Sequence, residues 1–123
     1  MNTLLWILQG FLALTFLYSG VCKSLLAEKT LVKMGQTGVE GLSPFFIKGI
    51  GISEILGATG LVVPEAFNIA PVLTPVSALC LALIMPFAAV IHYKRREYRS
   101  VVINVVVFCL CIFVAFARVF FYR

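Results

Sequence analysis

The sequence predicts an all-α protein that forms a four-helix transmembrane bundle, and three observations support this fold class. Hydrophobic residues make up 62% of the 123-residue chain, and charged residues make up only 12%. A soluble domain of this length cannot bury so much apolar surface. The apolar residues fall into four runs separated by charged clusters, and each run has close to the roughly 20 residues that a helix needs to cross a bilayer core. Residues 1–123 are therefore expected to form one transmembrane domain surrounded by lipid.

Local signals set the expected ends of the four helices. The first run carries Trp6 near its start, where an amphipathic ring suits the membrane interface, and ends before Lys23. Prolines stand at the boundaries of the next two runs: Pro44 precedes the second, Pro64 ends it and Pro71 begins the third. The predicted helices span residues 4–22, 45–64, 71–91 and 101–117.

The first run has an alternative interpretation as a cleaved signal peptide. No Lys or Arg precedes Leu4, and the segment at residues 18–22 is a poor cleavage or lipid-attachment site. A membrane-spanning helix is therefore the favoured interpretation.

The distribution of Lys and Arg predicts the orientation in the membrane. Two basic residues, Arg118 and Arg123, lie on the C-terminal side of the fourth run. Eight lie in or beside the loops at residues 23–44 and 92–100: Lys23, Lys29, Lys33, Lys48, Lys94, Arg95, Arg96 and Arg99. Because short cytoplasmic loops are enriched in basic residues, both loops are predicted to be cytoplasmic. The net charge of +5 then favours contact with anionic lipid head groups, and no nucleic acid is expected as a partner.

The first loop contains a pattern of its own between Leu25 and Met34, where apolar residues alternate with charged ones. A short amphipathic helix on the membrane surface explains this pattern, and an irregular surface loop explains it equally well. The glycine-rich stretch at residues 35–41 would then return the chain to the membrane.

Glu54 lies in the middle of the second run, where a bilayer leaves a carboxylate almost no water. An ionisable side chain at that depth suggests a functional site. At 100° per residue it shares a face with Gly51 and Ala58, so it is expected to point toward neighbouring helices. An unpaired carboxylate there would cost several kcal/mol, so Glu54 is expected to be protonated or paired with a cation.

In each of the other three runs, the residues on one face of the helix form a stripe with a polar residue at each end. These stripes and Glu54 together predict a polar pocket that could bind a ligand. Its candidate residues are Gln9, Lys23, Glu54, His92, Asn104 and Arg118. The same groups could instead form hydrogen bonds that only hold the helices together.

Small residues form a second pattern in the second run. Gly49, Ser53 and Gly57 recur at a spacing of four, which places them in one row on a helix. Such a row lets another helix approach the backbone closely, so helix packing is its favoured role.

Cysteine chemistry, metal binding and autonomous catalysis are not predicted. Cys109 and Cys111 point about 200° apart on a helix, so they cannot pair with each other. One histidine and scattered thiols offer no metal-ligand cluster. No Ser/His/Asp set, phosphate loop or carboxylate pair can be assembled, so no catalytic residue is assigned.

Several segments, spread over nearly the whole chain, resemble a known family. They are FLYSGVCK at residues 16–23, GIGISEILGA at residues 49–58 with the continuation to Pro64, the cluster at residues 92–96, and Asn104 with Arg118. These segments look like the DoxX-like family of small four-helix integral membrane proteins. The resemblance implies the same four-helix bundle in a bacterial inner membrane. The positions that match the family's recurring polar residues are Lys23, Glu54, His92, Asn104 and Arg118.

The resemblance implies different classes of function, because a fold does not determine activity. Some family members belong to oxidoreductase complexes of bacterial membranes, and a related eukaryotic branch includes a chaperone for nicotinic acetylcholine receptors. The favoured hypothesis is a non-enzymatic partner or chaperone that uses the polar face around Glu54, with another membrane protein or a second copy of the chain as its partner.

Two alternatives remain open at this stage. One is a membrane subunit of a quinone-linked oxidoreductase complex, with Glu54 or His92 handling protons and quinone as the candidate cofactor. The other is a bundle that binds a lipid or sterol-like ligand, by analogy with the emopamil-binding group of four-helix membrane proteins.

Overall fold

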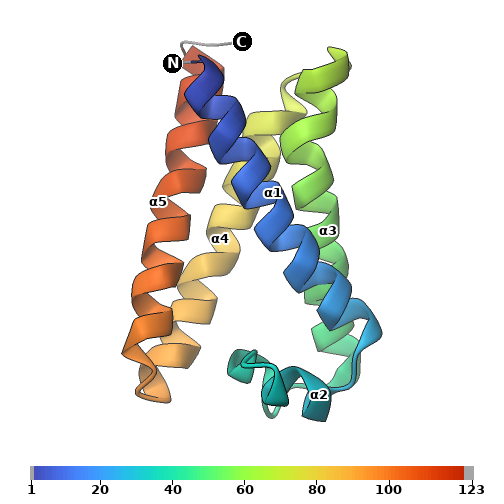
Figure 1. Cartoon of the computed structure of the whole chain (residues 1–123), viewed down its shortest axis with the longest axis vertical. Coiled ribbons are helices and arrows are strands. Elements are labelled where there is room, and N and C mark those ends of the chain that lie inside the picture. The colour runs from blue at the N-terminus through green and yellow to red at the C-terminus, as the bar shows by residue number, and fades with distance from the viewer. Residues whose placement is uncertain (1, 121–123) are drawn as a thin grey trace.

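The computed structural model describes residues 2–120, and these form four long helices, two short helical elements and connecting turns (Figure 1). The long helices are α1 (Asn2–Leu25), α3 (Pro44–Phe67), α4 (Leu73–Lys94) and α5 (Tyr98–Phe120). Each is long and apolar enough to cross a membrane. The predicted all-α transmembrane bundle is thus confirmed.

The long helices extend beyond most of the bounds expected from the apolar runs. Lys23 and His92, which were assigned to loops, lie in the last turns of α1 and α4. Pro64 lies inside α3, which ends only before Asn68, a residue in the left-handed conformation with φ 53°. The difference has a simple cause: hydropathy marks where the chain leaves the apolar layer, whereas a helix continues until its backbone hydrogen bonds end.

The first loop contains the short helix α2 (Glu28–Lys33) and the 3₁₀ turn η1 (Thr37–Val39). Of the two interpretations of this loop, the one with a short helix is therefore the one that the structure shows. The buried Leu31 lies on the apolar face of α2. Gly35 and Gly41 flank η1 with φ values of 98° and 87°, a backbone conformation that favours glycine.

The four long helices are arranged as two pairs. α1 packs along α3 and α4 packs along α5, while α3 and α4 join the pairs (Figure 1). α1 begins beside the end of α5 and crosses toward the start of α3 (Figure 1). We call the end that contains α2 and η1 the loop end, and the end that contains Asn2 and Phe120 the terminal end (Figure 1). All four long helices contribute buried side chains to the core.

Glycines set the distance between α1 and α3. A Cβ atom added at Gly20 would lie 2.6 Å from the carbonyl oxygen of Gly51, and one added at Gly51 would lie 2.8 Å from the carbonyl oxygen of Gly20. The two backbones therefore touch at this crossing, as small residues permit in membrane bundles.

Replacing Gly20 by Ala is expected to lower the free energy of unfolding by about 1–3 kcal/mol, because α1 and α3 must move apart. Gly10 is the matched control, since no atom lies within 4 Å of a Cβ at that position in α1. Gly10→Ala is expected to preserve stability or to raise it by up to about 1 kcal/mol through helix propensity. Unfolding in detergent micelles measures both changes, and equal stabilities for the two variants would contradict the close crossing.

Candidate functional site

Glu54 forms a buried ion pair between α1 and α3. Its Oε1 accepts a hydrogen bond from Lys23 Nζ at 2.8 Å and a longer one from Ser19 Oγ at 3.3 Å. The Glu54 side chain is 3% exposed and the Lys23 side chain 16%. Ser19 and Lys23 are four residues apart and so share one face of α1. The nearby crossing at Gly20 and Gly51 lets both donors reach the carboxylate.

The pair explains how a carboxylate is accommodated at this depth. Lys23 provides the opposite charge that an ionised Glu54 needs in an apolar environment. Its long side chain starts in the last turn of α1 and brings the ammonium group to Glu54 of α3. Glu54 therefore faces a neighbouring helix and a cation, in line with the expectation from the sequence.

Arg118 is the centre of a second buried cluster, at the terminal end of the bundle. The residue is 3% exposed. Its Nε donates to Gln9 Oε1 at 2.7 Å, and its Nη1 donates to Asn2 Oδ1 at 2.8 Å. Nη1 also lies 3.3 Å from Glu65 Oε1, and the guanidinium carbon lies 5.2 Å from the centre of the Trp6 ring. One side chain of α5 thus contacts α1 and α3 together.

Gln9 extends this cluster by bonding two other helices at once. Its Oε1 accepts from Arg118 of α5, and its Nε2 donates to the carbonyl oxygen of Leu61 in α3 at 2.5 Å. Gln9 is completely buried, and without these two bonds its side-chain oxygen and nitrogen would destabilise the fold as unpaired polar atoms. Glu65 was not among the residues singled out from the sequence, although its place near the end of α3 matches the depth of Arg118 near the end of α5.

The two buried clusters lie far apart along α1. Fourteen residues of α1 separate Gln9 from Lys23, a rise of about 21 Å at 1.5 Å per residue. The structure therefore divides the six candidate residues among separate clusters and does not bring them together in one pocket.

His92 belongs to a third cluster, at the loop end. Its Nδ1 lies 2.9 Å from Glu97 Oε1. Thr37 Oγ1 donates to Glu97 Oε2 at 2.7 Å, although the two residues are 60 positions apart. Arg95 bonds Glu97 through Nε at 3.2 Å and Glu40 through Nη1 at 2.7 Å. These contacts join the first loop to the turn between α4 and α5.

The contacts in the loop-end cluster shift the pKa values of Glu97 and Arg95. The hydrogen bond from Thr37, and after it the one with His92, lowers the pKa of Glu97 below its ordinary value of 4.5. The hydrogen bond with Glu40 raises the pKa of Arg95. Since folding depresses the pKa of Glu97, its contribution to stability is present above about pH 4.5 and is lost as the pH falls through the lower, folded-state value.

The pH dependence of Glu97→Gln tests this linkage. At neutral pH the variant is expected to unfold at a lower temperature than the unmodified chain, because it lacks the charged acceptor of the cluster. As the pH is lowered from 4.5, the difference is expected to shrink, since the unmodified carboxylate becomes protonated and loses the same interactions. Thermal unfolding at a series of pH values measures the difference, and one that stays constant down to pH 3 would contradict the assignment.

Asn104 differs from the other candidates in its polar contacts. Its Nδ2 is buried and has no hydrogen-bond partner among residues 2–120. The same is true of Thr74 Oγ1 in α4 and Ser24 Oγ in α1. Buried polar atoms without a hydrogen-bond partner are uncommon in proteins, and a water or ligand atom often supplies the missing partner.

The predicted small-residue row of α3 divides into two parts. A Cβ at Gly57 would meet Leu81 Cδ2 at 2.5 Å, so this glycine packs against α4. Gly49 and Ser53 are exposed, and a Cβ at Gly49 would meet no atom within 4 Å. Ser53 Oγ donates to the Gly49 carbonyl at 2.9 Å. This part of the row therefore remains uncovered by the described chain.

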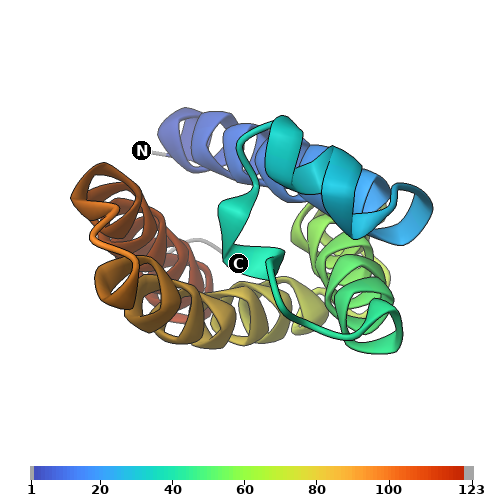
Figure 2. The same cartoon turned by 90° about the horizontal axis from the view of Figure 1, so that it is seen from below.

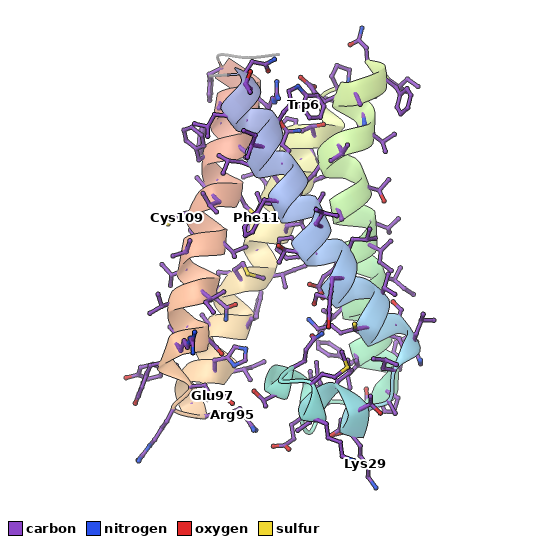
Figure 3. All side chains as sticks on the ribbon, viewed as in Figure 1. Trp6, Phe11, Lys29, Arg95, Glu97 and Cys109 are labelled. Atoms are coloured by element: carbon purple, nitrogen blue, oxygen red, sulfur yellow. The ribbon has the colours of Figure 1, made fainter. Side chains whose placement is uncertain are left out.

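Side chains that could hold a metal or take part in thiol chemistry are dispersed over the bundle (Figure 3). Within the described ranges, no group of three His, Cys, Asp or Glu side chains is arranged to bind a metal ion. Cys109 and Cys80 are exposed along their helices, Cys111 is buried and Cys22 is half-buried.

The comparison with protein families gives one match. A family model described as the DoxX-like family matches residues 7–114, which include α3 and α4 in full and most of α1 and α5. Searches of curated proteins and of solved structures gave no match.

Proposed function

Because the chain belongs to the DoxX-like family and has four helices able to span a membrane, we propose that it acts as a non-enzymatic partner or chaperone of another membrane protein. One observation supports this proposal above the others. The charged side chains buried in the bundle, Glu54 and Arg118, bond other helices of the same chain. Such contacts give a rigid scaffold, as interhelical polar bonds do in membrane proteins. The polar face around Glu54 then acts indirectly, by fixing α3 against α1.

The outer face of α3 is the proposed contact surface. Gly49 and Ser53 are exposed there, and the Ser53 hydroxyl is already bonded to the backbone. A transmembrane helix of the partner could approach α3 closely at this point, as small residues allow. The buried Lys23–Glu54 pair would hold this surface in place, since Glu54 follows Ser53 in α3 and lies about 100° around the helix from it.

The charge distribution supports a proposed orientation in a bacterial inner membrane. The exposed basic residues at the loop end are Lys29, Lys33, Lys48, Lys94, Arg95, Arg96 and Arg99. Under the positive-inside rule this end, with residues 23–44 and 92–100, faces the cytoplasm.

A second candidate function is the binding of an amphipathic ligand such as a quinone or a lipid. The buried Nδ2 of Asn104 favours it, because an acceptor oxygen of such a ligand would satisfy this donor. In a quinone-linked complex the electrons would have to come from a partner subunit.

Photo-crosslinking in native membranes tests the primary proposal. A photoreactive residue at position 53 is expected to yield a reproducible crosslink to one membrane protein. The same residue at position 83 is the control, because Leu83 is 66% exposed and belongs to a different helix, α4. Gly49→Leu is expected to abolish the crosslink from position 53, whereas Gly10→Leu, at another glycine with open space around it, is expected to preserve it.

The outcomes separate the candidate functions. Crosslinks from position 53 to lipid alone would contradict the proposed surface, and a crosslink to a second copy of the chain would identify a homo-oligomer. Mass spectrometry of the chain purified in mild detergent provides the other comparison. A stoichiometric quinone or lipid that is lost in Asn104→Leu would support the second candidate.

A further inference from the structure

The segment at residues 36–40, which we call the strap, lies across the loop end of the bundle. Figure 2 shows it between the two helix pairs, viewed from that end. It contains η1 and is flanked by Gly35 and Gly41, both with positive φ. Neither glycine has an atom within 4 Å of a hypothetical Cβ, so space around these turns is open.

The first anchor of the strap is apolar and belongs to the α1/α3 pair. Val39 is 4% exposed and forms a small buried cluster with Leu31 of α2 and Ile47 of α3. The half-buried Cys22, three residues before the end of α1, packs against this cluster. Val39 of the strap therefore completes the apolar cluster that partly covers Cys22.

The second anchor is polar and belongs to the turn between α4 and α5. Thr37 donates to Glu97, and Glu40 pairs with Arg95. A Cβ at Gly38 would lie 3.2 Å from His92 Nε2, so the strap backbone also lies close to the imidazole. The charged partners are only partly buried, with 28% exposure for Glu97 and 34% for Arg95. Water competes for such contacts, so they break more readily than buried ones.

The two anchors lie on different helix pairs, and they differ in strength. Near the terminal end, Arg118 and Gln9 tie α5 to α1 and α3 through buried bonds. At the loop end, α1 has moved away from α5, and the strap spans the space between the pairs (Figures 1 and 2). The strap thus has a buried apolar contact with one helix pair and a partly exposed polar contact with the other. A glycine on each side of it allows the backbone to turn.

We propose that the strap is a releasable clasp, which ties the α1/α3 pair to the α4/α5 pair. When its contacts with Glu97 and Arg95 are lost, only the packing of Val39 against Leu31 and Ile47 holds the strap, and its release from that packing exposes Cys22 to water. This inference goes beyond the proposed function, since it holds whatever partner the chain binds.

The reaction of Cys22 with a water-soluble maleimide tests the clasp. The full chain is labelled in lipid nanodiscs at neutral pH, and mass spectrometry measures the rate at each cysteine. Glu97→Ala removes both acceptor oxygens, and Thr37→Val removes the hydroxyl with little change in volume. Each variant is expected to speed labelling of Cys22 about two- to fivefold, as the loss of partly exposed polar contacts allows. Hydrogen exchange at residues 36–40 is expected to increase in the same variants.

Arg99→Ala is the matched control, because Arg99 is an exposed charge in the first turn of α5, close to Glu97 in sequence. It is expected to leave both rates unchanged. The buried Cys111 reports general loosening of the bundle and is expected to remain unlabelled. Unchanged Cys22 labelling in both clasp variants would overturn the proposal, and so would labelling of Cys111 in parallel with Cys22.

Discussion

Replacing Lys23 by Met is expected to lower the free energy of unfolding by about 3–5 kcal/mol, since it leaves the Glu54 carboxylate buried without its counter-charge. The Nζ atom of Lys23 lies 2.8 Å from Glu54 Oε1, and the Glu54 side chain is 3% exposed. Ser19 would remain as a neutral donor at 3.3 Å and cannot replace the lost charge. Reversible unfolding in detergent micelles at neutral pH measures the effect.

Lys33→Met is the control for this variant. Lys33 is exposed in the last turn of α2, at the same end of the bundle. Its replacement makes the same chemical change and is expected to alter stability by no more than about 0.5 kcal/mol. If the two variants were equally stable, the Lys23–Glu54 pair would have no part in holding α1 to α3.

Replacing Arg118 by Met is the second large expected effect, again about 3–5 kcal/mol of lost stability. The change removes the donor that Gln9 Oε1 accepts from, and it leaves Glu65 without its cation. Gln9 is completely buried, so its side-chain oxygen would lose a bond that water cannot replace.

The experiment for Arg118 uses the same unfolding measurement with Arg99→Met as its control. Arg99 is exposed in the same helix, and its replacement is expected to change stability by no more than about 0.5 kcal/mol. Crosslinks between α1 and α5 near the terminal end are expected to weaken only in Arg118→Met. A variant as stable as the control would show that the cluster does not join these helices.

Hydropathy and helical periodicity could predict most of the fold. Four apolar runs imply four spans because a bilayer sets the length of a helix, and the direction of Glu54 follows from the small residues beside it. The expectation that Glu54 pairs with a cation follows from the cost of an isolated buried charge. The choice of Lys23 could not be predicted, because a helical projection shows a face without showing which helix lies against it.

Which of the other candidate residues become bonding partners depends on how each helix tilts and which helix lies beside it. The periodicity of a single sequence does not show either. α1 starts beside α5 and ends beside α3, so Gln9 bonds Arg118 while Lys23, on the same stripe of α1, bonds Glu54. His92 lies at the end of α4 and bonds Glu97 in the adjoining turn. These partners lie at the same depth as the residues they bond, which is the signal that could have identified Glu65 for Arg118.

The strap was the least predictable feature. Thr37 and Glu97 are 60 residues apart, and neither lies in an apolar run. A glycine-rich loop with scattered polar residues fits many surface conformations equally well. Only the placement of the helix ends shows that this loop can reach the turn between α4 and α5.

A double-mutant cycle of Lys23→Met and Glu54→Gln tests the central claim most directly, that the buried charges hold the bundle together. The four proteins of the cycle are compared by unfolding in the same detergent. The account predicts a coupling energy of about 2–3 kcal/mol, with the double variant more stable than Lys23→Met alone, because the uncompensated carboxylate is removed. Effects that add to within about 0.5 kcal/mol would show that the two side chains act independently, and would contradict the account.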